Sequence, residues 1–294
     1  LSPHVMAAAV ILTAGAALAL SPKAEAILGN LTYAEKVSLL HGTGRTVPYV
    51  GNTAAIPRVG LPALTLNDGP QGFRADAYPG TSTQWPAALA AAATWNPEAV
   101  RKWASEMGQE FKEKGANVFL GPGVNVARVP VNGRNFEYLS GEDPYLGAAL
   151  VKPFVEGMQA QGVVVCVKHY ALNNQETNRQ TVSAEVSNAT FREVYLPPFE
   201  AAVAAGVGSV MCSYNKIRGR WACENPAFLG LLKRELGFRG FVVSDWGATH
   251  SPSIAKGLDQ EMPAARYMNA AKLRGVGAAL VNRSARAIVG ALDA

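Results

Sequence analysis

Short apolar runs and longer amphipathic stretches alternate along most of this chain. The apolar runs predict strands at residues 61–66, 116–120, 163–167, 208–212 and 240–243. The amphipathic stretches predict helices at residues 97–114, 144–161, 190–205 and 226–236, with closing helices within 270–292. Asn96-Pro97 is typical of a helix start, because an amide can cap the first turn and proline fits its first position.

This alternation is typical of a parallel sheet covered by helices, either a closed barrel or an open doubly wound sheet. No G-x-G-x-x-G turn follows a predicted strand, which disfavours a dinucleotide-binding sheet. Reactive side chains follow strand after strand instead: Asp68, Arg134, Lys168, His169, Tyr214, Asp245 and Trp246. Because barrel enzymes build their active sites at the carboxyl ends of the strands, we predict an α/β fold, a (β/α)8 TIM-like barrel.

The composition fits one large folded domain. The 294 residues are 49% apolar and 17% charged, as in ordinary globular proteins. The net charge of +5 comes from lysines and arginines that are dispersed and not interleaved with aromatic residues, so we expect no nucleic-acid partner.

The amino-terminal segment resembles a secretory leader. Residues 6–20 are rich in small and aliphatic side chains, and Ala24-Glu25-Ala26 follows as a small-x-small cleavage pattern. We predict a signal peptide over residues 1–26, a barrel domain over 27–294 and a secreted protein, with a transit-type terminus as the alternative. The apolar run is shorter than the ~20 residues that cross a bilayer, so we expect no membrane span in the mature chain.

The three cysteines are Cys166, Cys212 and Cys223. They are too few and too widely spaced for a tetrahedral zinc site, and no histidine completes one, so we expect no metal. Cys212 and Cys223 flank a short polar stretch, which fits either a disulfide-closed loop or two free buried thiols.

Asp245 is the strongest candidate for a catalytic group. It directly follows the predicted strand at 240–243 and precedes Trp246. A carboxylate beside a flat aromatic ring suits the nucleophile of a retaining glycosidase, which attacks the anomeric carbon of a sugar. The alternative is a structural role for Asp245 as a helix N-cap.

Three further segments carry side chains that could bind sugar hydroxyls. Lys168-His169 follows another strand, although both could be buried and satisfied by a structural carboxylate. Asp68 lies in a Gly/Pro turn and could accept two hydroxyl hydrogens, or simply cap that turn. Arg134 and Glu137 could form a structural ion pair, or present an Arg fork that Glu137 orients.

Seven segments together resemble glycoside hydrolase family 3, in its β-glucosidase branch, from about residue 31 to residue 263. They are Leu31-Thr32 with Glu35-Lys36, Asn67-Asp68-Gly69-Pro70, Gly133-Arg134-Asn135-Phe136-Glu137 with Gly141-Glu142-Asp143-Pro144, Lys168-His169-Tyr170, Met211-Cys212-Ser213-Tyr214-Asn215, Ser244-Asp245-Trp246 and Gly257-Leu258-Asp259-Gln260-Glu261-Met262-Pro263. The resemblance implies an exo-acting retaining β-glucosidase that needs no cofactor. The nearest alternative substrate is a β-xyloside.

The resemblance also implies roles for individual residues. Asp245 would be the nucleophile, and the subsite for the terminal sugar would be formed by Asp68, Arg134, Lys168, His169 and Tyr214, with Trp246 beside it and Arg74 as a weaker contact. A Cys212–Cys223 disulfide would follow from the pairing that secreted eukaryotic relatives often have.

In this branch of the family the acid/base glutamate comes from a second, carboxyl-terminal domain, which the 294 residues do not include. Single-domain β-N-acetylglucosaminidases of the family use instead a second histidine in the loop after the same strand, and this sequence lacks it. We therefore expect the chain to pack against such a domain in a complete enzyme, or else to be a non-catalytic sugar-binding barrel.

Overall fold

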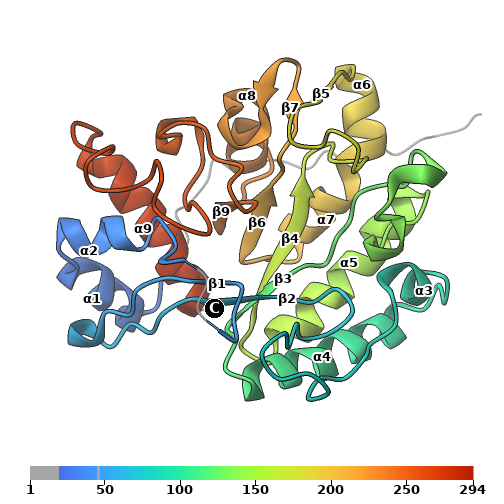
Figure 1. Ribbon diagram of the computed structural model, residues 1–294, viewed down its shortest axis with the longest axis horizontal. Coiled ribbons are helices and arrows are strands. Elements are labelled where there is room, and N and C mark those ends of the chain that lie inside the picture. The colour runs from blue at the N-terminus through green and yellow to red at the C-terminus, as the bar shows by residue number, and fades with distance from the viewer. Residues whose placement is uncertain (1–19, 45–46, 294) are drawn as a thin grey trace, which may run out of the picture.

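The computed structural model describes residues 20–44 and 47–293. Its main sheet has six strands in the order β1-β2-β3-β4-β6-β9. Their bounds are β1 Gly51–Asn52, β2 Thr65–Asp68, β3 Val118–Leu120, β4 Val164–Tyr170, β6 Ser209–Cys212 and β9 Phe241–Ser244. From β2 to β9 the neighbours are parallel, and β1 is antiparallel to β2. The predicted parallel sheet is thus confirmed from β2 to β9, and the antiparallel β1 makes the whole a curled mixed sheet (Figure 1).

Isolated bridges extend the sheet beyond β9. Val243 pairs with Gln260, His41 pairs with Glu261, and Thr43 pairs with Ala264. The Thr43 N–H also donates to the carbonyl oxygen of Asn52 in β1, at 2.8 Å. Of the predicted (β/α)8 barrel, the described residues thus show six regular strands in the main sheet, and these two connecting segments pair only at single positions.

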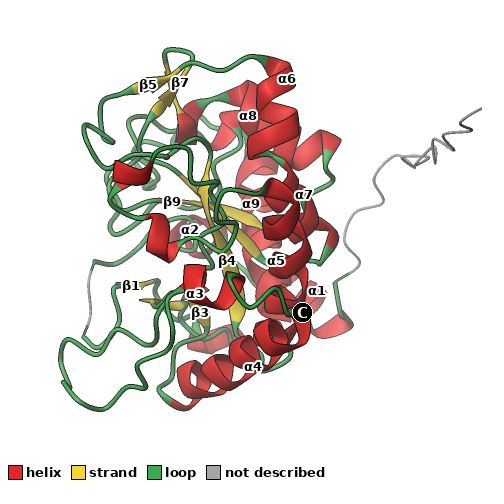
Figure 2. Ribbon diagram, turned by 90° about the vertical axis from the view of Figure 1, so that its right-hand side faces the viewer, coloured by secondary structure: helices red, strands yellow, loops and turns green. Residues whose placement is uncertain are grey.

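The longer helices lie together on the outer side of the sheet, and the long loops gather on the opposite side (Figure 2). The helical bounds are α1 Pro22–Asn30, α2 Tyr33–Ser38, α3 Ala88–Ala92, α4 Pro97–Glu113, α5 Pro144–Gln159, α6 Asn188–Thr190, α7 Pro197–Ala204, α8 Pro226–Gly230 and α9 Ala278–Asp293, with short 3-10 turns at Pro57–Val59, Pro130–Asn132, Asn135–Glu137, Ala222–Glu224 and Ile254–Lys256. Helices α4 and α5 start where their caps predict: Asn96 accepts from the N–H of Glu98 at 3.0 Å, and Asp143 from that of Tyr145 at 2.8 Å.

Two predicted helices are interrupted. The segment 190–205 divides into the end of α6, a π-helical turn at Phe191–Tyr195 and α7, and the segment 226–236 divides into α8 and a π-helical turn at Leu231–Glu235. In the first, Pro197 has no N–H to donate, so the α-helical hydrogen-bond ladder cannot run through it and restarts there. Of the closing segment 270–292, only the part within α9 is helical.

Strand ends also differ from the prediction. β2 begins only at Thr65, because Pro62 cannot donate to a neighbouring strand and Leu61 pairs locally with Ile56. β4 continues through Tyr170, so Lys168 and His169 lie within the strand. A small sheet of β5 Ser183–Ala184, β7 Lys216–Ile217 and β8 Arg220–Trp221 was not predicted, because strands of two residues leave no periodic pattern.

The amino-terminal helices pack against the last helix. α1 and α2 lie beside α9 (Figure 1). The predicted cleavage pattern Ala24-Glu25-Ala26 falls inside α1, where Ala24 is buried. Most of the predicted signal peptide lies outside the described residues, and the signal peptide stays a prediction. Across the part of the chain that the structure describes, no helix combines the length and apolarity needed to span a membrane.

Candidate active site

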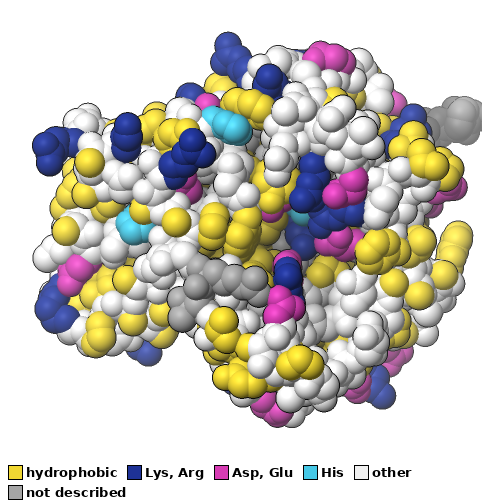
Figure 3. Space-filling model, viewed as in Figure 1, with side chains coloured by type: hydrophobic (Ala, Val, Ile, Leu, Met, Phe, Trp, Pro, Cys, Tyr) yellow, Lys and Arg dark blue, Asp and Glu magenta, His cyan; other side chains and the backbone are white. Residues whose placement is uncertain are grey.

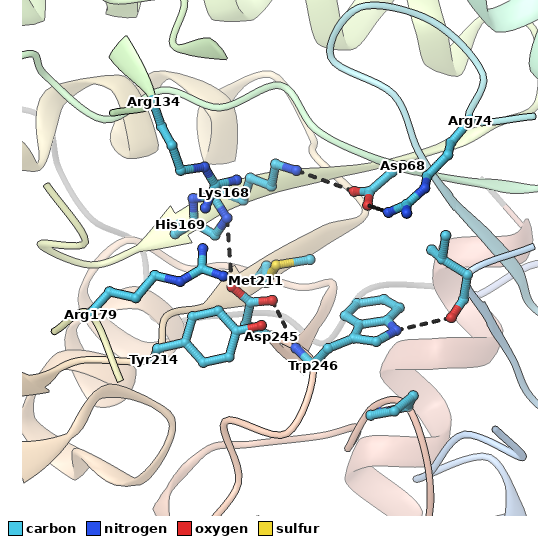
Figure 4. Close-up of a pocket in the computed structure, with 12 residues that line it drawn as sticks. Asp68, Arg74, Arg134, Lys168, His169, Arg179, Met211, Tyr214, Asp245 and Trp246 are labelled. Carbon is cyan, nitrogen blue, oxygen red and sulfur yellow. Dashed lines mark hydrogen bonds and ion pairs between the residues drawn. The ribbon is translucent and has the colours of Figure 1, made fainter. Parts of the chain in front are cut away.

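A pocket of about 450 Å³ opens at the carboxyl ends of the parallel strands. Figure 3 shows the charged side chains that gather in this central hollow, and Figure 4 shows them at close range. Its lining consists of Val50, Asp68, Arg74, Arg134, Lys168, His169, Arg179, Met211, Tyr214, Asp245, Trp246 and Pro263. The fold thus brings together all eight side chains that the sequence analysis proposed for catalysis or sugar binding.

Asp245 lies at the end of β9, on the wall of the pocket. Its N–H donates to the carbonyl oxygen of Cys212 at the end of β6 (3.0 Å), and its Oδ1 accepts from the Trp246 N–H (2.8 Å). The N-cap alternative is wrong, because a turn and not a helix follows Asp245. The other oxygen, Oδ2, lies 3.6 Å from Nε2 of His169 (Figure 4).

Burial raises the pKa of Asp245 above its ordinary value. The Trp246 N–H, the charges of Lys168 and Arg134 and the hydroxyl of Tyr214 act against this rise, because they stabilise the carboxylate. Burial also lowers the pKa of His169 well below its usual range, with help from Arg134 and Lys168, so its imidazole is neutral at pH 7. Asp245 is therefore a desolvated carboxylate held among hydrogen-bond donors.

Lys168 and Arg134 are joined by one buried carboxylate, that of Glu137. Lys168 Nζ lies 3.0 Å from Glu137 Oε1, and Arg134 donates to both Glu137 oxygens at 2.8 and 2.9 Å. Burial alone would raise the pKa of Glu137, but the charges of Lys168 and Arg134 lower it to about 2. Burial would likewise lower the pKa of Lys168, and Glu137 and Asp68 raise it instead. All three groups are thus ionised at neutral pH.

Asp68 is the last residue of β2 and lies near two cations. Its carboxylate lies 3.5 Å from Lys168 Nζ and 3.5 Å from Arg74. Arg74 also pairs with Asp76 at 2.9 Å, and its side chain is 47% exposed, which places it at the mouth of the pocket. Lys168, only 3% exposed, lies at the bottom.

Trp246 forms a fixed aromatic wall. Its Nε1–H donates to the carbonyl oxygen of Val50 at 2.9 Å. Gly51 leaves room for the ring, because a Cβ at that position would lie only 2.8 Å from Cζ2 of Trp246. A flat ring held in this way can contact the apolar face of a sugar.

Arg179 is a pocket residue that sequence reasoning missed. Its guanidinium lies 4.7 Å from the centre of the Tyr214 ring, and it pairs with Glu176 at 3.1 Å. Glu176 also pairs with Arg134 at 3.5 Å. The only available signal was the position of Arg179 in the polar loop that follows β4, since such loops form the active-site edge of a barrel.

The cysteines resolve one open alternative. Cys212 and Cys223 form a disulfide, which ties the end of β6 to the polar loop after it. Cys166 is free and buried, and burial raises its pKa to about 12. No group of histidine, cysteine, aspartate and glutamate side chains in residues 20–44 and 47–293 has the arrangement of a metal site.

Comparisons with known proteins agree with this geometry. A family model described as "Glycosyl hydrolase family 3 N terminal domain" matches residues 12–284. "Probable beta-glucosidase L" of Aspergillus terreus is 47% identical over 250 residues, which are 83% of this chain and 33% of the relative. The chain therefore spans about a third of that relative's length.

Solved structures give the same result. A β-glucosidase from Streptomyces venezuelae, crystallised with D-glucose, has a TM-score of 0.86 and 37% identity, over 92% of this chain and 37% of that one. The β-D-glucoside glucohydrolase of Trichoderma reesei has a TM-score of 0.87 and 37% identity, over 92% and 40%. From the family match and these relatives we conclude that the chain belongs to glycoside hydrolase family 3 and corresponds to the amino-terminal domain of that family.

Proposed function

We propose that this chain is the nucleophile-bearing part of a retaining exo-β-glucosidase, which removes terminal non-reducing β-D-glucosyl residues. The observation that carries the proposal is the position of Asp245, a buried carboxylate in a pocket that is also lined by cations, the Tyr214 hydroxyl, the carboxylate of Asp68 and the ring of Trp246. A pocket of about 450 Å³ is large enough for a single sugar ring. The relatives' names and the D-glucose complex support the same substrate class.

In this mechanism Asp245 attacks the anomeric carbon, and the bond from that carbon to the leaving oxygen breaks. Water then releases the sugar from the covalent intermediate. Lys168, Arg134 and Tyr214 stabilise the carboxylate before attack. Asp68, Lys168 and His169 bind the sugar hydroxyls, and Trp246 packs against the sugar.

The first step also needs a carboxylic acid that protonates the leaving oxygen, about 5 Å from the nucleophile in retaining enzymes. Three other carboxylates in and around the pocket are already engaged in ion pairs with cations. Glu137 has a pKa of about 2, Asp68 lies between Lys168 and Arg74, and Glu176 lies between Arg134 and Arg179. We propose that the acid belongs to a second domain, encoded in the two thirds of the relatives that this chain does not span.

We further propose that the sheet is a complete (β/α)8 barrel. The bridged segments around Gln260 and His41 would be the seventh and eighth strands of the barrel, between β9 and β1. This closure would place the Asp245 pocket in the usual position for a barrel enzyme, at the carboxyl ends of the strands. A secreted location is proposed from the leader-like segment at residues 6–20.

Covalent trapping tests the function. The 294-residue chain is incubated with 2-deoxy-2-fluoro-β-D-glucosyl fluoride, whose leaving group needs little acid assistance, and is digested for mass spectrometry. We expect one glycosyl adduct, on the peptide that contains Asp245. Asp245→Asn should abolish it, whereas Asp143→Asn, at a helix cap where Asn is equally suitable, should not.

An adduct on another residue, or one that persists in Asp245→Asn, would contradict the assigned nucleophile. The second candidate function is a non-catalytic sugar-binding barrel, favoured by the ion pairs that Asp68 and Glu137 form with Lys168, Arg74 and Arg134. Glucose binding without any adduct would support that candidate. Faster trapping by the matching xylosyl donor would identify a β-xylosidase.

A further inference from the structure

Strand β4 presents two consecutive side chains to one pocket. Neighbouring side chains of a regular strand point to opposite faces, yet Lys168 and His169 both line the pocket. The pairing with β6 shifts in the same stretch, where Val167 pairs with Val210 and Tyr170 with Cys212, and the peptide bond between Lys168 and His169 is cis. Three steps along β4 thus match two along β6, which is a β-bulge. Bulges commonly redirect side chains next to active sites.

The bulge is supported from the other side, by residues 122–125. The Lys168 N–H donates to the carbonyl oxygen of Pro122 at 3.0 Å, and the Val124 N–H donates to that of Lys168 at 2.8 Å. At the next residue, His169, the hydrogen bonds come from the side chain of Asn125 and not from a backbone partner. The His169 N–H donates to Asn125 Oδ1 at 2.7 Å, and Asn125 Nδ2–H donates to the His169 carbonyl oxygen at 3.1 Å (residues 168 and 169 are seen in Figure 4).

Asn125 is therefore a substitute for a strand partner at one position. It is 3% exposed, and its amide forms hydrogen bonds with both backbone polar groups of His169. Without Asn125 these two buried groups would have no hydrogen-bond partner at the bulge. The same residue, His169, places its Nε2 3.6 Å from Oδ2 of Asp245. Asn125, which lies outside the pocket lining, thus holds the backbone of His169, and the Tyr138 hydroxyl lies 3.5 Å from Nδ1 of its ring.

We infer that Asn125 is a positioning residue, which holds the β4 bulge so that His169 faces Asp245 and the sugar. The inference rests on the proposed glycosidase function. A displacement of a reacting group by about 1 Å can cost on the order of 100-fold in rate. Loss of the two Asn125 hydrogen bonds should therefore slow catalysis in addition to lowering stability.

Asn117 offers a matched control. Its Oδ1 accepts from the Thr65 N–H at 2.8 Å, and its Nδ2–H donates to the Ala63 carbonyl oxygen at 2.8 Å. It therefore makes the same pair of amide-to-backbone hydrogen bonds, but at the start of β2 and β3, the end of the sheet remote from the pocket.

The test compares Asn125→Ala and Asn117→Ala with the unmodified chain. One readout is the rate of fluoroglucosyl trapping on Asp245, and the second is the imidazole resonance of His169 in a ¹³C-histidine spectrum, assigned with His169→Gln. We expect Asn125→Ala to slow trapping by about 10- to 100-fold and to shift the His169 resonance. Asn117→Ala should lower thermal stability while both readouts stay unchanged.

Equal trapping rates in the two variants, or an unshifted His169 resonance in Asn125→Ala, would overturn the inference. If the unmodified chain forms no adduct, the proposed function fails, and the His169 resonance alone still decides the role of Asn125. Should Asn125→Ala not fold, Asn125→Ser replaces it, because the shorter side chain keeps a neutral hydroxyl but does not span both backbone groups of His169. A smaller change in the same two readouts is then expected.

Discussion

The chemistry of the pocket depends on how its charges are paired. Lys168, Arg134 and Asp245 are all withdrawn from water, and an unpaired charge in such a place would be costly. Glu137 offsets this cost for both cations at once, because its two oxygens reach Lys168 and Arg134. Lys168 also pairs with Asp68, and Arg134 also pairs with Glu176. Glu137 itself is not part of the pocket lining, so it supports the side chains proposed to bind the sugar.

Replacement of Glu137 by Gln should destabilise the fold in a pH-dependent way. The pKa of Glu137 falls from 4.5 to about 2 on folding, so its contribution is fully present above pH 4.5 and is lost as the pH falls towards 2. A shift of that size corresponds to a loss on the order of 3 kcal/mol at pH 7. Chemical denaturation at pH 7 and at pH 3 measures it.

The difference between Glu137→Gln and the unmodified chain should shrink at pH 3. Glu142→Gln, which removes an exposed carboxylate nearby, is the control and should change stability little at either pH. An equal loss at both pH values would show that Glu137 contributes through packing and not through its charge.

At the scale of elements, the sequence predicted what has a local cause. Helices α4 and α5 begin at their capping residues, and the buried cores of β3, β4, β6 and β9 lie within the predicted apolar runs. The bulge in β4 was not predictable in this way, because it arises from how β4 pairs with β6. Lys168 and His169 could be named as site residues because they follow an apolar run, whereas Asn125 was missed because its contacts depend on that bulge.

The site residues were also predictable where their place depends on local sequence and were missed where it depends on distant segments. Side chains directly after apolar strands, such as Asp68 and Asp245, were found because their place in the chain fixes their place in the fold. Arg179 lies within a long loop, and only the stacking on Tyr214 shows that it returns to the pocket. The disulfide was undecided from spacing alone, since Cys212 and Cys223 could equally have been buried thiols.

The Cys212–Cys223 disulfide should stabilise the pocket edge. It closes a loop with a sequence separation of 11, and that loop carries Tyr214, which hydrogen-bonds Asp245. For a loop of this length we expect the paired variant Cys212→Ser/Cys223→Ser to lose roughly 2–3 kcal/mol of stability. Thermal unfolding with and without reductant measures the effect, and reductant should lower the midpoint of the unmodified chain only. A midpoint that reductant leaves unchanged would contradict the prediction.

For the molecule as a whole, the segments at both ends of the described chain pack side by side (Figure 1). The Ser21 hydroxyl donates to Asp293 Oδ1 at 2.7 Å, and the Ser21 N–H donates to Asp293 Oδ2 at 2.9 Å. Glu25 of α1 pairs with Arg286 of α9. Helix α9 in turn packs on β9, the strand that Asp245 directly follows. The amino-terminal helix is therefore part of the support behind Asp245, the proposed nucleophile.

A chain that starts after the small-x-small pattern, at Ile27, should be less stable than one that starts at Leu20. It loses the Ser21 cap, the Glu25–Arg286 ion pair and the buried side chains of Leu20 and Ala24. Their removal should cost roughly 2–4 kcal/mol, mostly from the lost apolar burial. Thermal unfolding of residues 20–294 and 27–294 gives the difference, with Glu25→Gln in the longer chain to isolate the exposed ion pair. Equal midpoints would favour cleavage of a leader after Ala26. A large loss of thermal stability in the shorter chain would place any leader cleavage before Ser21, since the mature protein has to keep the helix that supports α9 and β9.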